Sequence, residues 1–266
     1  MARLNHLEKK AKMIDKYSPS EWENLYLQMY ADSALSDLSQ SAKAGRNGLT
    51  SDGKVEKMIL EDIWKKISQK SHQEILDLGC GCGPLTNQIM ERCNLYAHSL
   101  TMMDQELVIS KIANSDQTLG HVKLIHGIFP YDSNLLGNQR FDSIILYGVI
   151  HYTTDPVNFI YSLIEFLKPG GHLLIADIPN SDKKQRFMLT KHGIQIDKEY
   201  RNSFNANNNV MPIAESQSPI EFNDVFVTNL LRLTRNKGCE SFLLSQPPGL
   251  PFCFTRDDIL VVKNLA

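Results

Sequence analysis

The chain has 266 residues, 42% of them hydrophobic, so it is long enough to bury the core of one large domain. Its 28 basic and 30 acidic residues nearly balance, which excludes the strongly basic composition of many nucleic-acid-binding proteins. The first residues lack the apolar run of a signal peptide, and no stretch of about 18 apolar residues predicts a membrane span. We therefore expect a cytoplasmic protein without nucleic-acid or membrane partners; the oligomeric state stays open.

The N-terminal region is predicted to form a helical cap over residues 1–53. Apolar residues recur at helical spacing over 4–16, and a second helix is expected to begin at Ser20, a good N-cap residue. Residues 39–53 are small and polar, which is typical of a loop. We expect the main domain to follow, over residues 54–266.

The middle of the chain alternates between short apolar strands and amphipathic helices. After a helix over 55–69, strands are predicted over 74–79, 97–104, 121–127, 141–150 and 172–178, with helices over 84–93, 107–113 and 156–167 between them. Such alternation indicates an α/β, Rossmann-like, doubly wound fold, in which helices cover both faces of a mostly parallel sheet.

The end of the chain breaks this alternation. Residues 193–221 are polar and carry too few apolar groups for a core of their own, so they are interpreted as a variable insertion. A helix is predicted over 223–236, followed by strands over 241–246 and 258–264. The short loop between these strands favours an antiparallel hairpin at the sheet edge, which completes a seven-stranded sheet.

The five cysteines do not form a pattern that binds metal. Cys80 and Cys82 are the one close pair in the sequence, and no second pair or histidine cluster completes four zinc ligands. An odd, scattered set of cysteines also does not resemble a disulfide framework. We expect no metal site.

The first strand of the alternation leads into a glycine-rich turn, Gly79-Cys80-Gly81-Cys82-Gly83, and then into a helix. Glycines let the backbone pass close to a ligand, and the helix N-terminus offers free N–H groups. The NAD fingerprint G-x-G-x-x-G is matched at Gly79 and Gly81, but its third glycine is Pro84 here. An NAD-binding oxidoreductase is therefore disfavoured and stays an alternative.

Five features between about residues 54 and 264 resemble, in order and spacing, the class I S-adenosylmethionine (SAM)-dependent methyltransferases. They are "ILDLGCGCGPL" at 75–85, Asp104 at the end of the second strand, "FDSIILYGVIHYTTDP" at 141–156, "LKPGGHLLIADI" at 167–178, and the terminal helix with its hairpin. The resemblance implies that SAM is the methyl donor and that the acceptor is O or N of a small molecule, for example a sugar or modified sugar. A non-catalytic SAM-binding module is the second alternative.

The resemblance also implies which residues meet the cofactor. Asp104 matches the acidic residue that accepts hydrogen bonds from the ribose hydroxyls, and Asp77 can order the turn or reach the ammonium group through water. Where the family often has an acidic residue for adenine, this chain has Ile128 and Phe129, so we expect backbone contacts with Phe129 or Met103 as an apolar wall. The expected cofactor residues are Asp77, Gly79, Cys80, Gly81, Asp104, Gln105, Ile128, Phe129 and Tyr147.

The loop after the fourth strand offers a candidate catalytic base, His151. Histidine has the side-chain pKa nearest neutrality, and this loop opens at the carboxyl ends of the strands, where ligands bind in α/β sheets. The alternative is that His151 packs beside the cofactor. The residues expected to bind the acceptor are Tyr26, Tyr30, Tyr152 and His192; aromatic residues at helical spacing such as the first two are also common in cores.

Overall fold

The computed structural model describes residues 54–67, 70–114, 120, 122–196, 198, 220–250 and 252–265. The expected cap over 1–53, which contains Tyr26 and Tyr30, lies outside the described residues. So does most of the insertion expected over 193–221.

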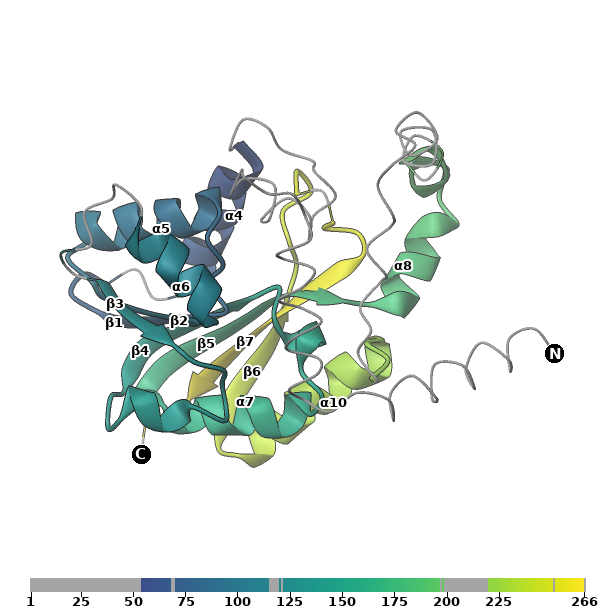
Figure 1. The fold of residues 1–266 in the computed structure, drawn as a ribbon. Helices are drawn as coiled ribbons and strands as arrows, with labels where there is room; N and C mark the ends of the chain where they lie inside the picture. Colours follow the sequence, from purple (N-terminus) through teal and green to yellow (C-terminus); the bar gives the residue numbers. More distant parts are fainter. Residues whose placement is uncertain are drawn as a thin grey trace, which may run out of the picture.

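The described chain is organised around one seven-stranded sheet with the strand order β3-β2-β1-β4-β5-β7-β6 (Figure 1). The strands are β1 (Glu74–Leu78), β2 (Ser99–Asp104), β3 (Val122–His126), β4 (Phe141–Tyr147), β5 (Leu167–Pro179), β6 (Cys239–Leu244) and β7 (Arg256–Lys263). Neighbouring strands among β1 to β5 pair in parallel, whereas β7 is antiparallel to both β5 and β6. The predicted mostly parallel sheet with a C-terminal antiparallel hairpin is confirmed.

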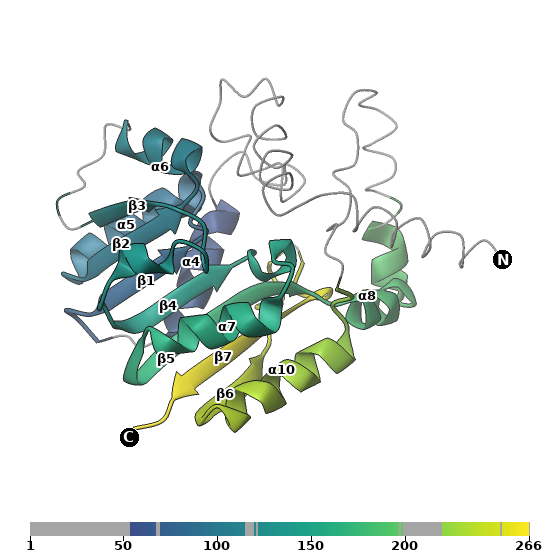
Figure 2. The ribbon, with the colours of Figure 1, turned by 60° about the horizontal axis from the view of Figure 1, so that its bottom comes forward.

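Helices cover both faces of this sheet (Figures 1 and 2). On one face lie α4 (Lys54–Lys66), α5 (Pro84–Leu95) and α6 (Glu106–Ala113); on the other lie α7 (Pro156–Glu165) and α10 (Asp224–Asn236). Successive residues of the central strand β4 point to opposite faces: Ile144 belongs to the core under α7, and Ile145 to the core under α4 and α5. The near-continuous apolar run of this strand follows from burial on both faces.

Two boundaries differ from the sequence predictions because of backbone geometry. The fourth strand was expected to reach residue 150 but ends at Tyr147, since Gly148 takes a left-handed φ of 70° and a 3₁₀ turn, η2 (Ile150–Tyr152), follows. The fifth strand begins at Leu167 rather than residue 172, with a register shift opposite residues 141–143 and Gly170 at φ 74°.

The helix that directly follows β5 was not predicted. Helix α8 (Ser181–Met188) follows β5, and its N-cap Asn180 accepts a hydrogen bond from the Lys183 N–H. None of its residues is buried, so the sequence carries no apolar periodicity from which a helix could be recognised.

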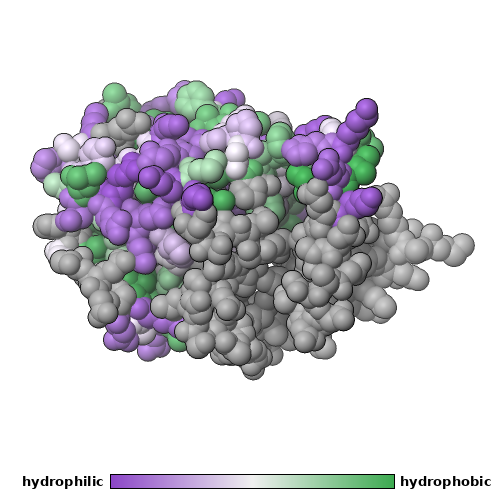
Figure 3. Space-filling model, turned by 90° about the horizontal axis from the view of Figure 1, so that it is seen from above, coloured by the Kyte–Doolittle hydropathy of each residue, from purple (hydrophilic) through white to green (hydrophobic). Residues whose placement is uncertain are grey.

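The surface of the described part is mixed in character. On the face seen in Figure 3, hydrophilic and hydrophobic residues are interspersed, as on most solvated protein surfaces. Within the described ranges, no helix combines the length and hydropathy needed to cross a bilayer.

Candidate cofactor and acceptor site

The glycine turn adopts a conformation that requires glycine. Gly79 and Gly81, directly after β1, have φ values of 68° and 62°. A Cβ atom added at Gly79 would lie 2.5 Å from Val149 Cγ2, whereas one added at Gly81 would meet nothing within 4 Å. At Gly79 the protein itself fills the space beside the backbone, whereas at Gly81 that space is open to a ligand.

Alanine substitutions should separate these two glycines. Each costs about 1–2 kcal/mol of folding free energy because its φ is positive, and Gly79→Ala should cost about 1–3 kcal/mol more because its methyl group overlaps Val149. Gly81→Ala should instead weaken binding of S-adenosylhomocysteine (SAH), the demethylated form of SAM. Denaturant unfolding and calorimetry measure the two effects. Equal losses of stability, with no loss of SAH affinity for Gly81→Ala, would contradict this assignment.

One carboxylate ties this turn to the next strand. Asp104, the last residue of β2, accepts hydrogen bonds from the Gly81 N–H at 2.8 Å and from the Gln105 N–H, at the N-cap of α6, at 2.7 Å. Burial raises the pKa of Asp104, and these two hydrogen bonds oppose the rise. A carboxylate has about four lone-pair positions, so two remain for hydroxyl groups of a ligand.

Asp77 is a second carboxylate at the carboxyl ends of the strands. Its side chain is 3% exposed, and within the described residues its Oδ2 atom has no hydrogen-bond partner. Burial, with the nearby charge of Asp104, raises the pKa of Asp77 to about 7. A buried, unpartnered carboxylate oxygen fits a cationic group such as the α-ammonium of SAM.

The raised pKa predicts how Asp77 affects the stability of the ligand-free chain. The folded state keeps a proton that the unfolded state releases above the ordinary pKa of 3.8, so Asp77 lowers stability as the pH rises from about 4 to 7. Asp77→Asn cannot ionise, so it should stabilise the chain by about 1–3 kcal/mol at pH 8, where Asp77 is an unpartnered buried charge, and by much less at pH 4.5. Urea unfolding of both proteins at the two pH values measures this. A difference that does not change with pH would contradict it.

The residues expected at adenine divide between the surface and the core. The Ile128 N–H donates to Asp132 Oδ2 at 2.8 Å, and the Ile128 side chain is half-buried. Phe129 is 6% exposed and packs edge-on against the rings of Phe159 and Phe166. Met103 is fully buried. The side chains of Phe129 and Met103 both belong to the core under α7, and their role as an adenine wall stays a prediction.

His151 lies in η2, after the end of β4, and is nearly buried there. Its side chain is 8% exposed, its Nδ1 atom has no partner among the described residues, and its ring lies 4.3 Å from that of Tyr152. Burial, reinforced by the positive charge of Arg256 and opposed by Asp177, lowers the pKa of His151 to about 4. A neutral imidazole with this pKa is a weak general base at neutral pH. A direct role for His151 stays a prediction.

The remaining expected residues are spread over the site and beyond it. Tyr147 ends β4 and packs against the core under α4 and α5, and Tyr152 is 53% exposed. Burial raises the pKa of the Cys80 thiol, and the Cys80 carbonyl accepts a hydrogen bond from Thr86 Oγ1. In the part of the chain that the structure describes, no group of three or more His, Cys, Asp or Glu residues can hold a metal ion.

His192 belongs to a separate aromatic cluster. Its ring stands edge-on to Phe187 at 5.7 Å and to Phe254 at 5.6 Å, and these two phenylalanine rings stack at 5.0 Å. The cluster joins α8 to the segment before β7. Its role toward an acceptor stays a prediction.

Sequence reasoning missed three charged residues of this region: Asp132, Asp177 and Arg256. Asp177 lies near the end of β5 as Asp104 lies at the end of β2. The rule that ligands meet the carboxyl ends of parallel strands could therefore have found it. Asp132 and Arg256 carry no comparable signal, because their places depend on packing between distant segments.

Comparison with known proteins supports the same family. The ubiquinone biosynthesis O-methyltransferase of Schizosaccharomyces pombe is 27% identical over 128 residues, which are 45% of this chain and 43% of that protein. The plantazolicin methyltransferase BpumL, solved with a substrate analogue and SAH, has a TM-score of 0.60 at 13% identity over 97% of this chain and 99% of its own. A SAM-dependent methyltransferase from Aquifex aeolicus gives a TM-score of 0.52 at 15% identity over 81% of this chain and 95% of its own.

The chain spans less than half the length of the S. pombe relative. The solved structures share the fold. The family model described as a methyltransferase domain matches residues 69–221, more than half of the chain. The chain therefore belongs to this family of class I, SAM-dependent methyltransferases.

Proposed function

We propose that this chain transfers the methyl group of SAM to an oxygen or nitrogen atom of a small molecule. The proposal rests on the hydrogen bond that joins the end of β1 to the end of β2. The glycine turn after β1 is bound to Asp104 at the end of β2, beside the unpartnered oxygen of Asp77. These groups match the chemistry of SAM in two places: a carboxylate for a ribose diol and a buried anion for an ammonium group.

Different residues would bind different parts of SAM. The free lone pairs of Asp104 would accept from the ribose hydroxyls, and Asp77 would receive the α-ammonium group. The open space at Gly81 lets the methionine portion lie against the backbone. At the helix that follows, Pro84 occupies the first position of α5, where the NAD fingerprint needs glycine for close helix–sheet packing.

Methyl transfer requires mainly that the acceptor atom be correctly oriented. The cofactor supplies a methyl group already activated by a positively charged sulfur. As the acceptor atom bonds to the methyl carbon, the carbon–sulfur bond breaks and its electron pair stays on sulfur; the acceptor gives up a proton. Fixing the acceptor in line can contribute about 7–11 kcal/mol toward the barrier.

The acceptor class is supported by two lines of reasoning. The S. pombe relative is named as an O-methyltransferase of ubiquinone biosynthesis, which supports a hydroxyl group on a small molecule. The net charge of −2 gives no support to a nucleic-acid acceptor. A sugar acceptor and a cytoplasmic location stay predictions.

Methyl-labelled SAM tests this function without a known acceptor. The chain is incubated with labelled SAM and the low-molecular-weight fraction of a cell extract, and label is followed into small molecules. Enzyme-dependent transfer into a small molecule is expected. Transfer into protein or nucleic acid only, when whole extract is supplied, would contradict the proposed acceptor class; SAH binding without any transfer would favour the non-catalytic alternative.

A further inference from the structure

Asp177, near the end of β5, points its carboxylate toward the end of β4. Its Oδ2 atom lies 3.7 Å from the position that a Cβ atom on Gly148 would occupy. The residue is 8% exposed, and within the described residues Oδ2 accepts no hydrogen bond. The other oxygen, Oδ1, has one long contact, at 3.5 Å, with Gln246 Nε2. A nearly buried carboxylate thus keeps one oxygen unused beside the loop that leads to His151.

The backbone at Asp177 is bent in a way that turns this side chain. Its φ is 61°, in the left-handed region that non-glycine residues seldom adopt. The pairing of β5 with β7 also shifts register between Ile175 and Ile178, so β5 carries one extra residue there. Bulges of this kind re-aim a side chain and occur often beside active sites.

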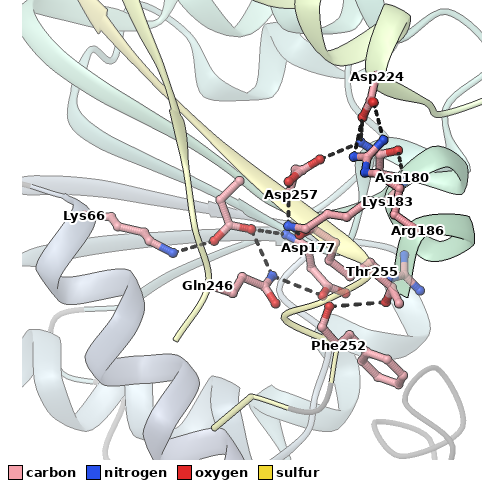
Figure 4. Close-up of polar contacts among 12 residues, drawn as sticks. Lys66, Asp177, Asn180, Lys183, Arg186, Asp224, Gln246, Phe252, Thr255 and Asp257 are labelled. Atoms are coloured by element: carbon pink, nitrogen blue, oxygen red, sulfur yellow. Dashed lines mark hydrogen bonds and ion pairs between the residues drawn. The ribbon is translucent and has the colours of Figure 1, made fainter. Parts of the chain in front are cut away.

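A buried polar network holds the bend in place (Figure 4). The Asp177 N–H donates to Asp258 Oδ1 at 2.8 Å, and Gln246 Nε2 donates to the same oxygen at 3.0 Å. The second oxygen of Asp258 accepts from Lys66 Nζ, which reaches across from α4, at 2.6 Å. The strained residue is therefore fixed through its peptide group, and among the described residues Oδ2 of its carboxylate is left for another partner.

That carboxylate lies beside η2 and the carboxyl ends of the central strands. The turn η2 packs against β5. The charge of Asp177 raises the pKa of His151, and that of Arg256 lowers it. The ends of β4 and β5 are neighbours in the sheet, next to β1 with its glycine turn. The unused oxygen of Asp177 lies where it can accept a hydrogen bond from a ligand at these strand ends.

We propose that Asp177 binds the methyl acceptor directly, by accepting a hydrogen bond from the hydroxyl or amine group that receives the methyl group. The substrate class is then a small molecule whose nucleophilic atom carries a proton. As the new bond to the methyl carbon forms and the carbon–sulfur bond breaks, that proton passes to the Asp177 carboxylate and from there to water. This inference rests on the proposed methyltransferase function.

Two variants of Asp177 test the assignment. Asp177→Gly removes the carboxylate, suits a φ of 61°, and keeps the peptide N–H that bonds to Asp258. Asp177→Asn keeps a hydrogen-bond acceptor but cannot take up the proton. Both should bind SAH within about twofold of the parent chain, while label transfer from SAM to the small-molecule fraction falls about 10- to 100-fold, as expected for loss of a hydrogen bond to a charged group. The control is Ala97→Gly, which relieves a φ of 52° on the turn after α5 and should leave transfer unchanged.

The possible results distinguish failure of this inference from failure of the proposed methyltransferase function. Full label transfer by Asp177→Gly would overturn the assignment. A parallel loss of SAH affinity would also overturn it, by placing Asp177 at the cofactor. If the parent chain binds SAH but labels no small molecule, the proposed function itself is wrong and the assignment falls with it.

Discussion

Asp104→Ala is expected to raise the Kd for SAH by at least about 100-fold, because two hydrogen bonds to a charged group, at about 1.5–3 kcal/mol each, are lost. The substitution removes the acceptor proposed for the ribose hydroxyls. It also frees the Gly81 N–H, so the turn loses its anchor to β2. Isothermal titration of both proteins with SAH measures the change.

The matched control for this experiment lies at the opposite end of the sheet. Asp142, near the start of β4, also accepts from a backbone N–H, that of Glu74 at 2.8 Å, and pairs with Lys168 at 2.7 Å. Asp142→Ala should therefore lower stability by a comparable mechanism while SAH affinity stays within about twofold of the parent value. Equal losses of affinity in the two variants would show that Asp104 acts through stability alone.

Lys66→Ala is expected to destabilise the fold by about 3–5 kcal/mol, the usual cost of removing one partner of a buried ion pair. Lys66 contacts two carboxylates: Asp62 one turn earlier in α4, and Asp258, whose side chain is fully buried in β7. Burial raises the pKa of Asp62, and Lys66 opposes that rise. Without the ammonium group, both carboxylates lose their countercharge, and the backbone support of Asp177 weakens with them.

The neighbouring lysine supplies the comparison. Lys65 is exposed on the same helix, so Lys65→Ala should change the unfolding free energy by no more than about 0.5 kcal/mol. Urea unfolding curves of the two variants, recorded at the same pH, give the difference directly. If Lys66→Ala lies within about 1 kcal/mol of Lys65→Ala, the ion pair with Asp258 does not hold α4 to β7.

The sheet could be predicted from the sequence because its strands carry a strong local signal. β4 carries an apolar run, Ile144 to Leu146, that is buried on both faces, and α7 has a regular apolar stripe. Helix α8 has no buried face, and its N-cap Asn180 is tied to Asp224 and Asp257, which lie far along the chain. The sequence therefore offers no local pattern by which α8 could be recognised.

The site residues could be predicted where the local sequence determines their position, but not where contacts between distant segments determine it. Asp104 lies where the sequence places it because it ends a strand. The orientation of Asp177 depends on a bulge against β7, and the pKa of His151 depends on burial and on Arg256, far away in sequence. Phe129 directly follows Ile128, yet the core under α7 takes up its ring. Each of these outcomes is set by contacts between distant segments.

A calorimetric titration of the parent chain with SAH, run beside one with NADH, tests whether the glycine turn and Asp104 form a SAM site. We expect saturable binding of SAH at one site, with a Kd on the order of micromolar, and no comparable heat with NADH. Binding of NADH without binding of SAH, or no binding of either ligand, would contradict the assignment of a SAM site.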